Sequence, residues 1–146
     1  MKFLIQRVKE AKVEVNKETV GSINEGLLVL IGIKNTDTKE IADYMINKLI
    51  KLRIFEDENQ KFNLNINDAN GELLLVSQFT LYGNCEKGNR PSFDNAAKSN
   101  QAIELYNYIV NELKQKTDKV ETGIFGEYMQ VSLVNDGPAT FLLEKE

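Results

Sequence analysis

The feature that most constrains this fold is a pair of uninterrupted apolar segments of strand length. Residues 27–33 form the first segment and residues 73–76 form the second. Neither alternates between polar and apolar side chains, as a strand with one face in water would, so both are predicted to be strands covered on both faces. The chain must therefore build structure on either side of its central strands.

Around these two strands the sequence alternates with a period of two residues, which is typical of half-buried strands. Near the N-terminus, Phe3, Ile5 and Arg7 share one face of such a strand. Close to the C-terminus, the sequence at residues 136–138 predicts a turn between the last two strands. The predicted strands are residues 2–9, 11–15, 19–23, 27–33, 73–76, 129–133 and 139–143.

Two further segments place apolar residues at the spacing of one helix face. Asp37 or Thr38 can cap the first helix, and Ser99 can cap the second. A long polar loop over residues 83–98 precedes the second helix. The two apolar stripes consist of Ile41, Tyr44, Met45, Leu49 and Leu52 in the first helix and Ala102, Leu105, Tyr106, Ile109 and Leu113 in the second.

The number and order of these elements predict the fold class. Strands outnumber helices, and the chain has no repeat, linker or low-complexity segment. A length of 146 residues suits one compact domain with a core of its own. We therefore predict one α+β domain over residues 1–146, in which mostly antiparallel sheets curve into a barrel-like core with two main helices packed on it.

The complete absence of histidine restricts the possible chemistry. It removes the commonest general base and the commonest metal ligand, so Ser–His triads and histidine-based zinc sites are excluded. The single cysteine, Cys85, cannot form an intrachain disulfide and has no histidine to activate it. Catalysis must therefore use carboxylates, hydroxyls, lysine, backbone dipoles or the substrate itself, and we expect no metal and no cofactor.

The charge balance bears on the partners. The formal net charge is −4 and the pI is near 5.0, which argues against a protein that coats nucleic acid by bulk attraction. A local basic patch can still grip a few phosphates. The N-terminal apolar run is too short for a signal peptide, and no segment approaches a membrane-spanning length. We therefore expect a cytoplasmic protein with no membrane and no DNA partner.

Three polar segments could carry chemistry. Residues 77–81 follow a buried strand and bring two hydroxyls, an amide and free backbone N–H groups that could stabilise an oxyanion. Residues 135–140 contain a Gly-Pro pair, and residues 90–93 contain an arginine that could contact phosphate. Each segment also has a structural interpretation, namely a satisfied strand end, an ordinary turn and a solvated loop. The residues alone leave these alternatives open.

Taken in this order, the same segments resemble the bacterial D-aminoacyl-tRNA deacylase family. The specific signature is Ser-Gln-Phe-Thr at residues 77–80 combined with Gly-Pro-x-Thr at residues 137–140. The resemblance covers essentially the whole chain. The other matching segments are residues 5–8, 26–30, 53–55, 63–65, 90–93, 129–133 and 135–138.

The resemblance implies a homodimer with active sites at the subunit interface. The strand end at residues 77–80 would form the pocket for the aminoacyl ester, and the Gly-Pro pair would enter the neighbouring subunit's pocket with a cis peptide bond. Arg7 would steady this pair, and Ala139 stands where the family often carries valine. The implied residues are Ser77, Gln78, Phe79 and Thr80 for catalysis and Arg7, Met129, Gly137, Pro138, Ala139 and Thr140 for substrate binding and chiral selection.

The implied reaction is hydrolysis of the ester of D-aminoacyl-tRNA to a free D-amino acid and tRNA. An L-residue would press its side chain into the Gly-Pro carbonyls, whereas glycine should pass and be removed too. We hypothesise that N–H groups near Phe79 and Thr80 polarise the ester and that the 2′-hydroxyl of the terminal adenosine assists water. A Thr80 nucleophile is the alternative, although no base lies near to activate it. Rival interpretations are a module that removes a small L-residue from tRNA and a non-catalytic dimeric RNA-binding protein.

Overall fold

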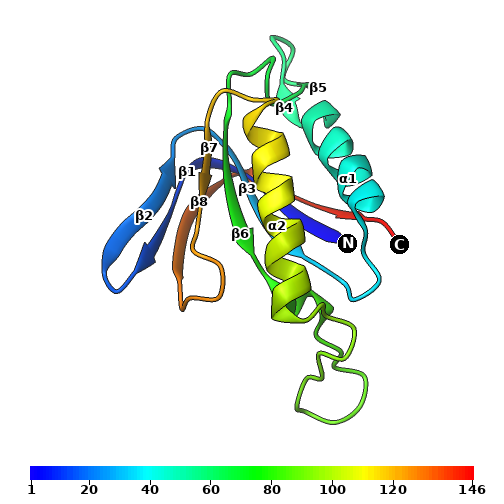
Figure 1. The fold of residues 1–146 in the computed structure, drawn as a ribbon. Helices are drawn as coiled ribbons and strands as arrows, with labels where there is room; N and C mark the ends of the chain where they lie inside the picture. The colour runs from blue at the N-terminus through cyan, green and yellow to red at the C-terminus, as the bar shows by residue number, and fades with distance from the viewer.

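A curved six-stranded sheet carries two helices on one face (Figure 1). The structure is a computed structural model and describes residues 1–146. None of its helices is both long and apolar enough to cross a membrane. In chain order the elements are β1 Lys2–Val15, β2 Glu18–Ile23, β3 Gly26–Gly32, α1 Lys39–Lys51, β4 Phe55–Glu56, β5 Phe62–Leu64, β6 Glu72–Ser77, the 3-10 helix η1 Phe79–Tyr82, α2 Ser99–Lys114, β7 Val120–Thr122 and β8 Gln130–Glu144.

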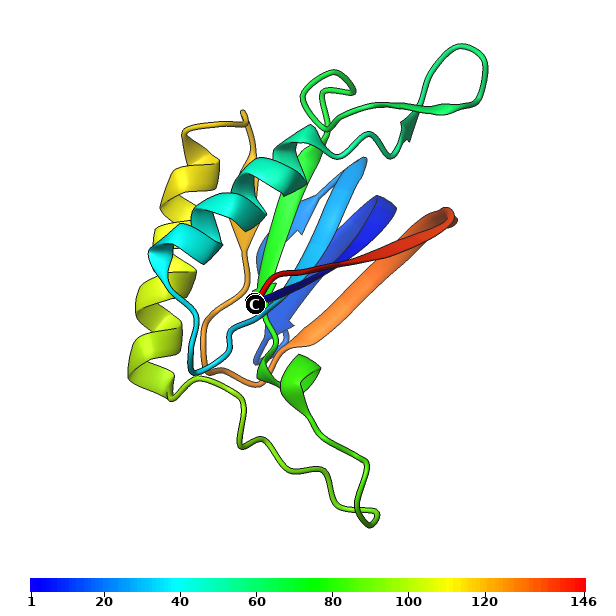
Figure 2. The same ribbon diagram turned by 90° about the vertical axis from the view of Figure 1, so that its right-hand side faces the viewer.

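Strand β1 organises the sheet because both of its edges are paired. One edge pairs with β3 and, further along, with β2, while the other edge pairs with β8, all antiparallel. Strands β6 and β7 continue the sheet in parallel from β3. The sheet then curls until β2 meets β7, where a Cβ added to Gly21 would collide with the carbonyl oxygen of Thr122. The expected α+β fold, with a barrel-like sheet and two packed helices, is confirmed (Figure 2).

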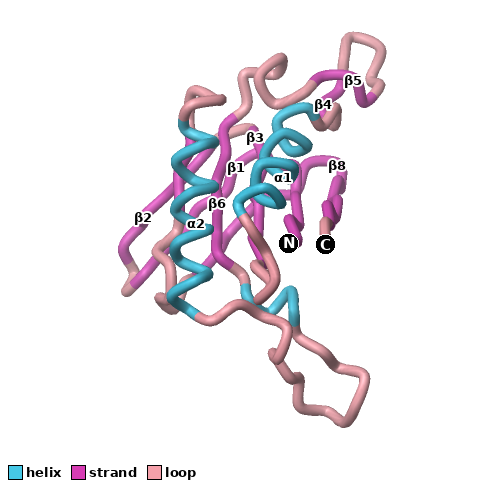
Figure 3. Tube along the Cα trace, turned by 45° about the vertical axis from the view of Figure 1, so that its right-hand side comes forward, coloured by secondary structure: helices cyan, strands magenta, loops and turns pink.

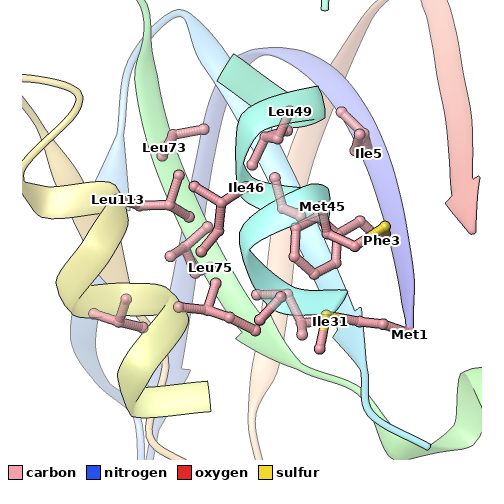
Figure 4. Packing of buried hydrophobic residues seen from close by; sticks show 14 of the residues in the cluster. Met1, Phe3, Ile5, Ile31, Met45, Ile46, Leu49, Leu73, Leu75 and Leu113 are labelled. Atoms are coloured by element: carbon pink, nitrogen blue, oxygen red, sulfur yellow. The ribbon is translucent and has the colours of Figure 1, made fainter. Parts of the chain in front are cut away.

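The central strands are covered on both faces, as their apolar runs predict. On β3, Leu27, Val29 and Ile31 face the cluster under the helices, whereas Leu28 belongs to a second cluster inside the curl. Figure 4 shows the helical side of this core, with side chains of α1 and α2 packed against those of the strands. Each fully buried aliphatic side chain of this kind contributes about 1.5–3 kcal/mol to folding.

The helix positions agree with the apolar periodicity, and so does the cap of α1, but the buried face of α1 differs from the prediction. Thr38 caps α1 and its hydroxyl accepts from the Ile41 N–H at 3.5 Å. Tyr44, which was predicted to lie in the apolar stripe, is 44% exposed. The buried face of α1 is instead formed by Ala42, Met45, Ile46 and Leu49.

Ser99 was predicted to cap the second helix, and this prediction is wrong. Ser99 is the first helical residue of α2, and Lys98 occupies the cap position. The cause is tertiary, because the N–H of Ala97 donates to the carbonyl of Ile33, the residue directly after β3, and this holds the preceding chain in an extended conformation. The first helical hydrogen bond then runs from the Ala102 N–H to the Lys98 carbonyl at 2.9 Å.

The C-terminal turn was also predicted wrongly. Residues 130–144 form one strand, β8, and both of its halves pair with β1, with Asn135 opposite Val8 and Thr140 opposite Gln6. The interval from Asn135 to Thr140 spans five residue steps on β8, but the paired interval on β1 spans only two. The extra residues, 136–139, therefore form a bulge, and the chain does not reverse its direction. The N-terminal segments at residues 2–9 and 11–15 likewise merge into β1. A small β4–β5 hairpin, not predicted from the sequence, stands at the end of the molecule opposite the loop of residues 83–98 (Figure 3).

Candidate functional site

The strand end at residues 77–80 turns sharply from β6 into η1. The N–H of Gln78 donates to the Ile31 carbonyl at 2.8 Å, which ends the pairing of β6 with β3. The Gln78 side-chain amide then donates to the Thr80 hydroxyl. Phe79 and Thr80 are exposed, and as the first residues of η1 their N–H groups have no acceptor within that helix. Two backbone donors are therefore left without a helical acceptor next to the hydroxyl-bearing residues Ser77 and Thr80.

A cleft of about 600 Å³ opens next to this strand end. Ser77, Gln78 and Phe79 line it, and so does Met129, the residue directly before β8. At its mouth, the ring of Phe93 packs edge-on against Phe79, with the ring centroids 5.0 Å apart. The structure thus gathers four of the predicted site residues, Ser77, Gln78, Phe79 and Met129, along one cleft, with Thr80 directly adjacent in sequence.

The bulge of β8, residues 136–139, holds the predicted Gly-Pro pair at its exposed crest. Gly137 has a φ of +138°, which favours glycine, and the Gly137–Pro138 peptide is cis. Ala139 is buried beneath the crest. Asn135 closes the base, because its Oδ1 accepts from the Ala139 N–H at 2.7 Å and its Nδ2 donates to the Thr140 hydroxyl at 3.1 Å.

Arg7 on β1 anchors the bulge through its buried side chain. Its Nε donates to the Asp136 carbonyl at 3.1 Å, immediately before Gly137. Its Nη1 donates to the Ile54 carbonyl at 2.8 Å, and its Nη2 lies 3.4 Å from a carboxylate oxygen of Glu56. The guanidinium also stands 5.1 Å from the ring centroid of Phe62. A buried charge with this many partners fixes the backbone that it touches.

Within one chain these residues form two separate groups. Arg7, Gly137 and Pro138 do not line the cleft, although Met129 on the same C-terminal segment does. Eight residue steps, about 26 Å of extended chain, separate Met129 from Gly137. Sequence reasoning missed Asn135, Ile54 and Glu56 as partners within the second group. Asn135 alone had a local signal, since asparagine commonly bonds nearby backbone in irregular segments.

Two titratable side chains near the two groups of site residues hold their protons more tightly than usual. Burial, followed by the nearby Asp37 and Glu144 carboxylates, raises the pKa of Tyr82 in η1, so its phenol stays protonated. Glu25 first, and then Asp136, raise the pKa of Lys9, which stays charged beside the bulge. No group of three or more Cys, Asp or Glu side chains in the chain could hold a metal ion. The strand end at residues 77–80 can supply backbone donors and hydroxyl groups, and the carboxylate of Glu127 also lines the cleft.

Comparison with known proteins shows similarity over the whole chain. The family model for D-Tyr-tRNA(Tyr) deacylase matches residues 4–144. The chain is 58% identical over 146 residues to a D-aminoacyl-tRNA deacylase from Thermosipho africanus (strain TCF52B), covering 100% of this chain and 98% of the relative. It is 53% identical over 144 residues to the protein of that name from Clostridioides difficile (strain 630), covering 99% and 97%.

Two solved structures share the fold. One, described as "c-Myc DNA Unwinding Element Binding Protein", superimposes with a TM-score of 0.95 at 40% identity and covers 100% of this chain and 99% of its own. The other, described as "Structural Analysis of a probable eukaryotic D-amino acid tRNA deacylase", has a TM-score of 0.84 at 17% identity and covers 97% of each chain. At that identity, the second likeness shows the fold alone.

Proposed function

The chain belongs to the D-Tyr-tRNA(Tyr) deacylase family, and from this premise we propose that it hydrolyses the ester of D-aminoacyl-tRNA to a free D-amino acid and tRNA. The observation that carries the proposal is the 58% identity to a D-aminoacyl-tRNA deacylase over the full chain. The enzyme is then an ester hydrolase acting on aminoacyl-tRNA. Its substrate places it in the cytoplasm, where charged tRNA is used.

The strand end at residues 77–80 supplies the catalysis in this proposal. The N–H groups of Phe79 and Thr80 polarise the ester carbonyl, and such donors act strongly where a site excludes water. The Ser77 and Thr80 hydroxyls order water or substrate, and the 2′-hydroxyl of the terminal adenosine assists the attacking water. A mechanism of this kind needs no histidine, metal or cofactor.

Substitution of Thr80 by valine separates this mechanism from a threonine nucleophile. If Thr80 only orders water, Thr80→Val slows single-turnover hydrolysis of D-tyrosyl-tRNA but does not abolish it. Complete loss with unchanged tRNA binding would instead assign the nucleophile to Thr80.

We further propose that the Gly-Pro bulge completes the site of a second copy of the chain. The bulge crest is exposed and lies outside its own chain's cleft. The outer edge of β8 has no partner strand, and Val134 and Leu142 on that strand are 50% and 51% exposed. Unpaired strand edges and exposed apolar side chains favour association. A homodimer would cover both.

Chiral selection follows from the position of this backbone wall. A D-residue directs its side chain away from the Gly137 and Pro138 carbonyls, whereas an L-residue presses its side chain into them. A clash with a rigid wall can separate D- from L-residues by more than the roughly 1–3 kcal/mol that one ordinary pocket contact provides. Glycine has no side chain to exclude, so glycyl-tRNA is expected to be hydrolysed as well.

The deciding experiment compares hydrolysis of D-tyrosyl-tRNA, L-tyrosyl-tRNA and glycyl-tRNA by the purified protein. We expect loss of the D-tyrosyl and glycyl esters and survival of the L-tyrosyl ester. Cleavage of small L-esters alone would instead indicate an L-residue editing module. Tight tRNA binding without ester loss would indicate a non-catalytic binding protein.

The same preparation should be tested against duplex DNA, because one structural relative is described as a DNA-element-binding protein. The net charge of −4 opposes binding by bulk attraction. Binding must then come from specific contacts, and duplex DNA lacks the aminoacylated end that the proposed site takes. We therefore expect far weaker binding to duplex DNA than to aminoacyl-tRNA in a gel-shift titration.

A further inference from the structure

A projecting loop beside the cleft is not used by the proposed reaction. The chain leaves η1 and returns to α2 through residues 83–98, which stand out from the body of the molecule (Figure 3). Asn84 and Ser92 form an antiparallel bridge with two backbone hydrogen bonds of 2.8 and 3.0 Å. Residues 84–92 therefore form a closed two-legged projection, which is called the arm below.

The base of the arm is tied to the body of the molecule beside the cleft. At its base, Phe93 packs against Phe79 at the cleft mouth. Beyond Phe93, the N–H of Asn35 donates to the Asn95 carbonyl at 3.0 Å and the N–H of Ala97 donates to the Ile33 carbonyl at 2.9 Å. These contacts join the loop to the end of β3, beside the strand end that carries the proposed catalytic residues.

The arm presents basic side chains without partners. Lys87 and Arg90 are exposed, and neither forms an ion pair or hydrogen bond within the chain. Basic residues at the other edges of the site are committed, since Lys9 pairs with Glu25 and Lys2 pairs with Glu144. In a chain with a net charge of −4, two uncommitted cations on a projection are available to an anionic partner.

A third basic residue continues this line toward the site. Lys98, where the loop rejoins α2, lines the cleft itself and also lacks an ion pair. The acidic side chains of the loop are Glu86 and Asp94, so residues 83–98 carry one more positive than negative charge. The positive groups thus run from the arm to the cleft.

We propose that the arm binds the sugar-phosphate backbone of tRNA next to its aminoacylated end, with Lys87 and Arg90 contacting phosphates. The proposal rests on the proposed function, which places the terminal ester in the cleft. Four residue steps lead from the bridge at Asn84 to Gly88, midway along the arm, which is a reach of at most about 14 Å. The arm therefore contacts nucleotides that precede the terminal adenosine. Arginine suits this role because its planar guanidinium matches phosphate oxygens in pairs.

The test compares Lys87→Ala, Arg90→Ala and the double variant with the wild type on two substrates. One is D-tyrosyl-tRNA, and the other is D-tyrosine esterified to adenosine alone, which has no phosphate. We expect KM for the tRNA to rise roughly two- to tenfold per substitution. The slope of log binding constant against log salt for uncharged tRNA should fall by about 0.7 per lost contact. The kcat/KM for the adenosine ester should stay at the wild-type value.

Two controls accompany these variants. Arg90→Lys keeps the charge and should recover most of the salt slope. Lys114→Ala removes an exposed, unpaired lysine at the far end of α2, about 24 Å along the helix from Ser99, and should leave both substrates unaffected.

Three results would overturn the inference. The first is an unchanged KM and salt slope for tRNA in the double variant. The second is an equal loss on the adenosine ester, which would indicate a structural role for the arm. The third is a shift of the double variant from dimer to monomer, which would assign the arm to a subunit interface. If the wild type cleaves no D-ester, the proposed function fails, but binding of uncharged tRNA still tests the arm.

Discussion

At the scale of single residues, the Gly-Pro bulge is held by two side chains that lie on opposite sides of it. Asn135 ties the start of the bulge to its end, and Arg7 binds the Asp136 carbonyl from the neighbouring strand. Gly137 must fit between them. A Cβ at this position would lie 3.1 Å from the Ala139 nitrogen and 3.2 Å from the Arg7 Nη2.

Gly137→Ala should therefore disturb both stability and selectivity. A φ of +138° strains any residue with a Cβ, and we expect the free energy of unfolding to fall by about 1–3 kcal/mol. Displacement of Arg7 should lower the ratio of D- to L-tyrosyl ester hydrolysis by roughly tenfold to a hundredfold. Denaturant unfolding measures the loss of stability. The rates of hydrolysis of D- and L-tyrosyl adenosine esters give the change in the ratio.

Gly88→Ala provides the matched control, because Gly88 has a φ of +69° but nothing within 4 Å of an added Cβ. This variant should lose stability while keeping the wild-type D-to-L ratio. Equal ratios for both variants would exclude Gly137 from chiral selection.

At the scale of elements, the strand-to-helix junction between β6 and η1 exposes the backbone donors of the proposed site. Proline is tolerated at the first position of a helix, where the missing N–H has no helical acceptor. Phe79→Pro should thus remove one proposed donor while η1 still forms. Phe79→Ala removes the same ring and keeps the N–H.

We expect single-turnover hydrolysis of D-tyrosyl-adenosine to be about 10²- to 10³-fold slower in Phe79→Pro than in Phe79→Ala. Circular dichroism of both variants checks that the fold is retained. Equal rates in the two variants would show that the Phe79 N–H takes no part in the reaction.

A second junction ties β6 to its neighbours through Glu72. One carboxylate oxygen accepts from the Asn24 N–H at 2.7 Å and from Lys119 at 2.9 Å. Burial alone would raise the pKa of Glu72, but Lys119 and Asn24 together hold it below the usual 4.5. A carboxyl with a lowered folded pKa stabilises the fold above its unfolded pKa, and that contribution is lost as the pH falls through the folded value.

Glu72→Gln should accordingly lower the Tm at pH 7, and the difference from wild type should shrink below about pH 4.5. Thermal unfolding between pH 3 and pH 7 measures this window. Glu104→Gln, at an exposed and unpaired position in α2, serves as the comparison. A Tm difference that stays constant across the range would contradict the assigned role of the carboxylate.

At the scale of the whole molecule, the two groups of site residues lie apart in one chain, so the proposed enzyme works only as a pair. In a symmetric dimer, each site then combines the strand end of one copy with the bulge of the other. Light scattering should give a mass of twice 16.6 kDa.

Mixing two defective variants tests this arrangement directly. A heterodimer of Phe79→Pro and Gly137→Ala has one site with both defects and one site with neither. After unfolding and refolding of an equal mixture, half of the Gly137→Ala chains are paired with a Phe79→Pro chain, whose bulge is intact. If the bulge acts across the dimer, these mixed dimers reject the L-ester, so the rate of L-tyrosyl ester hydrolysis per Gly137→Ala chain should fall by about half. If that rate is unchanged, each site lies within a single chain.

Local patterns in the sequence determined the buried strands at residues 27–33 and 73–76, the positions of both helices, most of the buried face of α2 and the polar segments that match the family. These depend on periodicity and on residue type, which neighbouring positions in the chain already contain. Only the tertiary structure decided whether residues 136–138 turn or bulge, because β1 offered partners to both halves of β8. It also decided that Arg7 binds Ile54 and Glu56, since contacts between residues 47 and 49 positions apart leave no local pattern in the sequence.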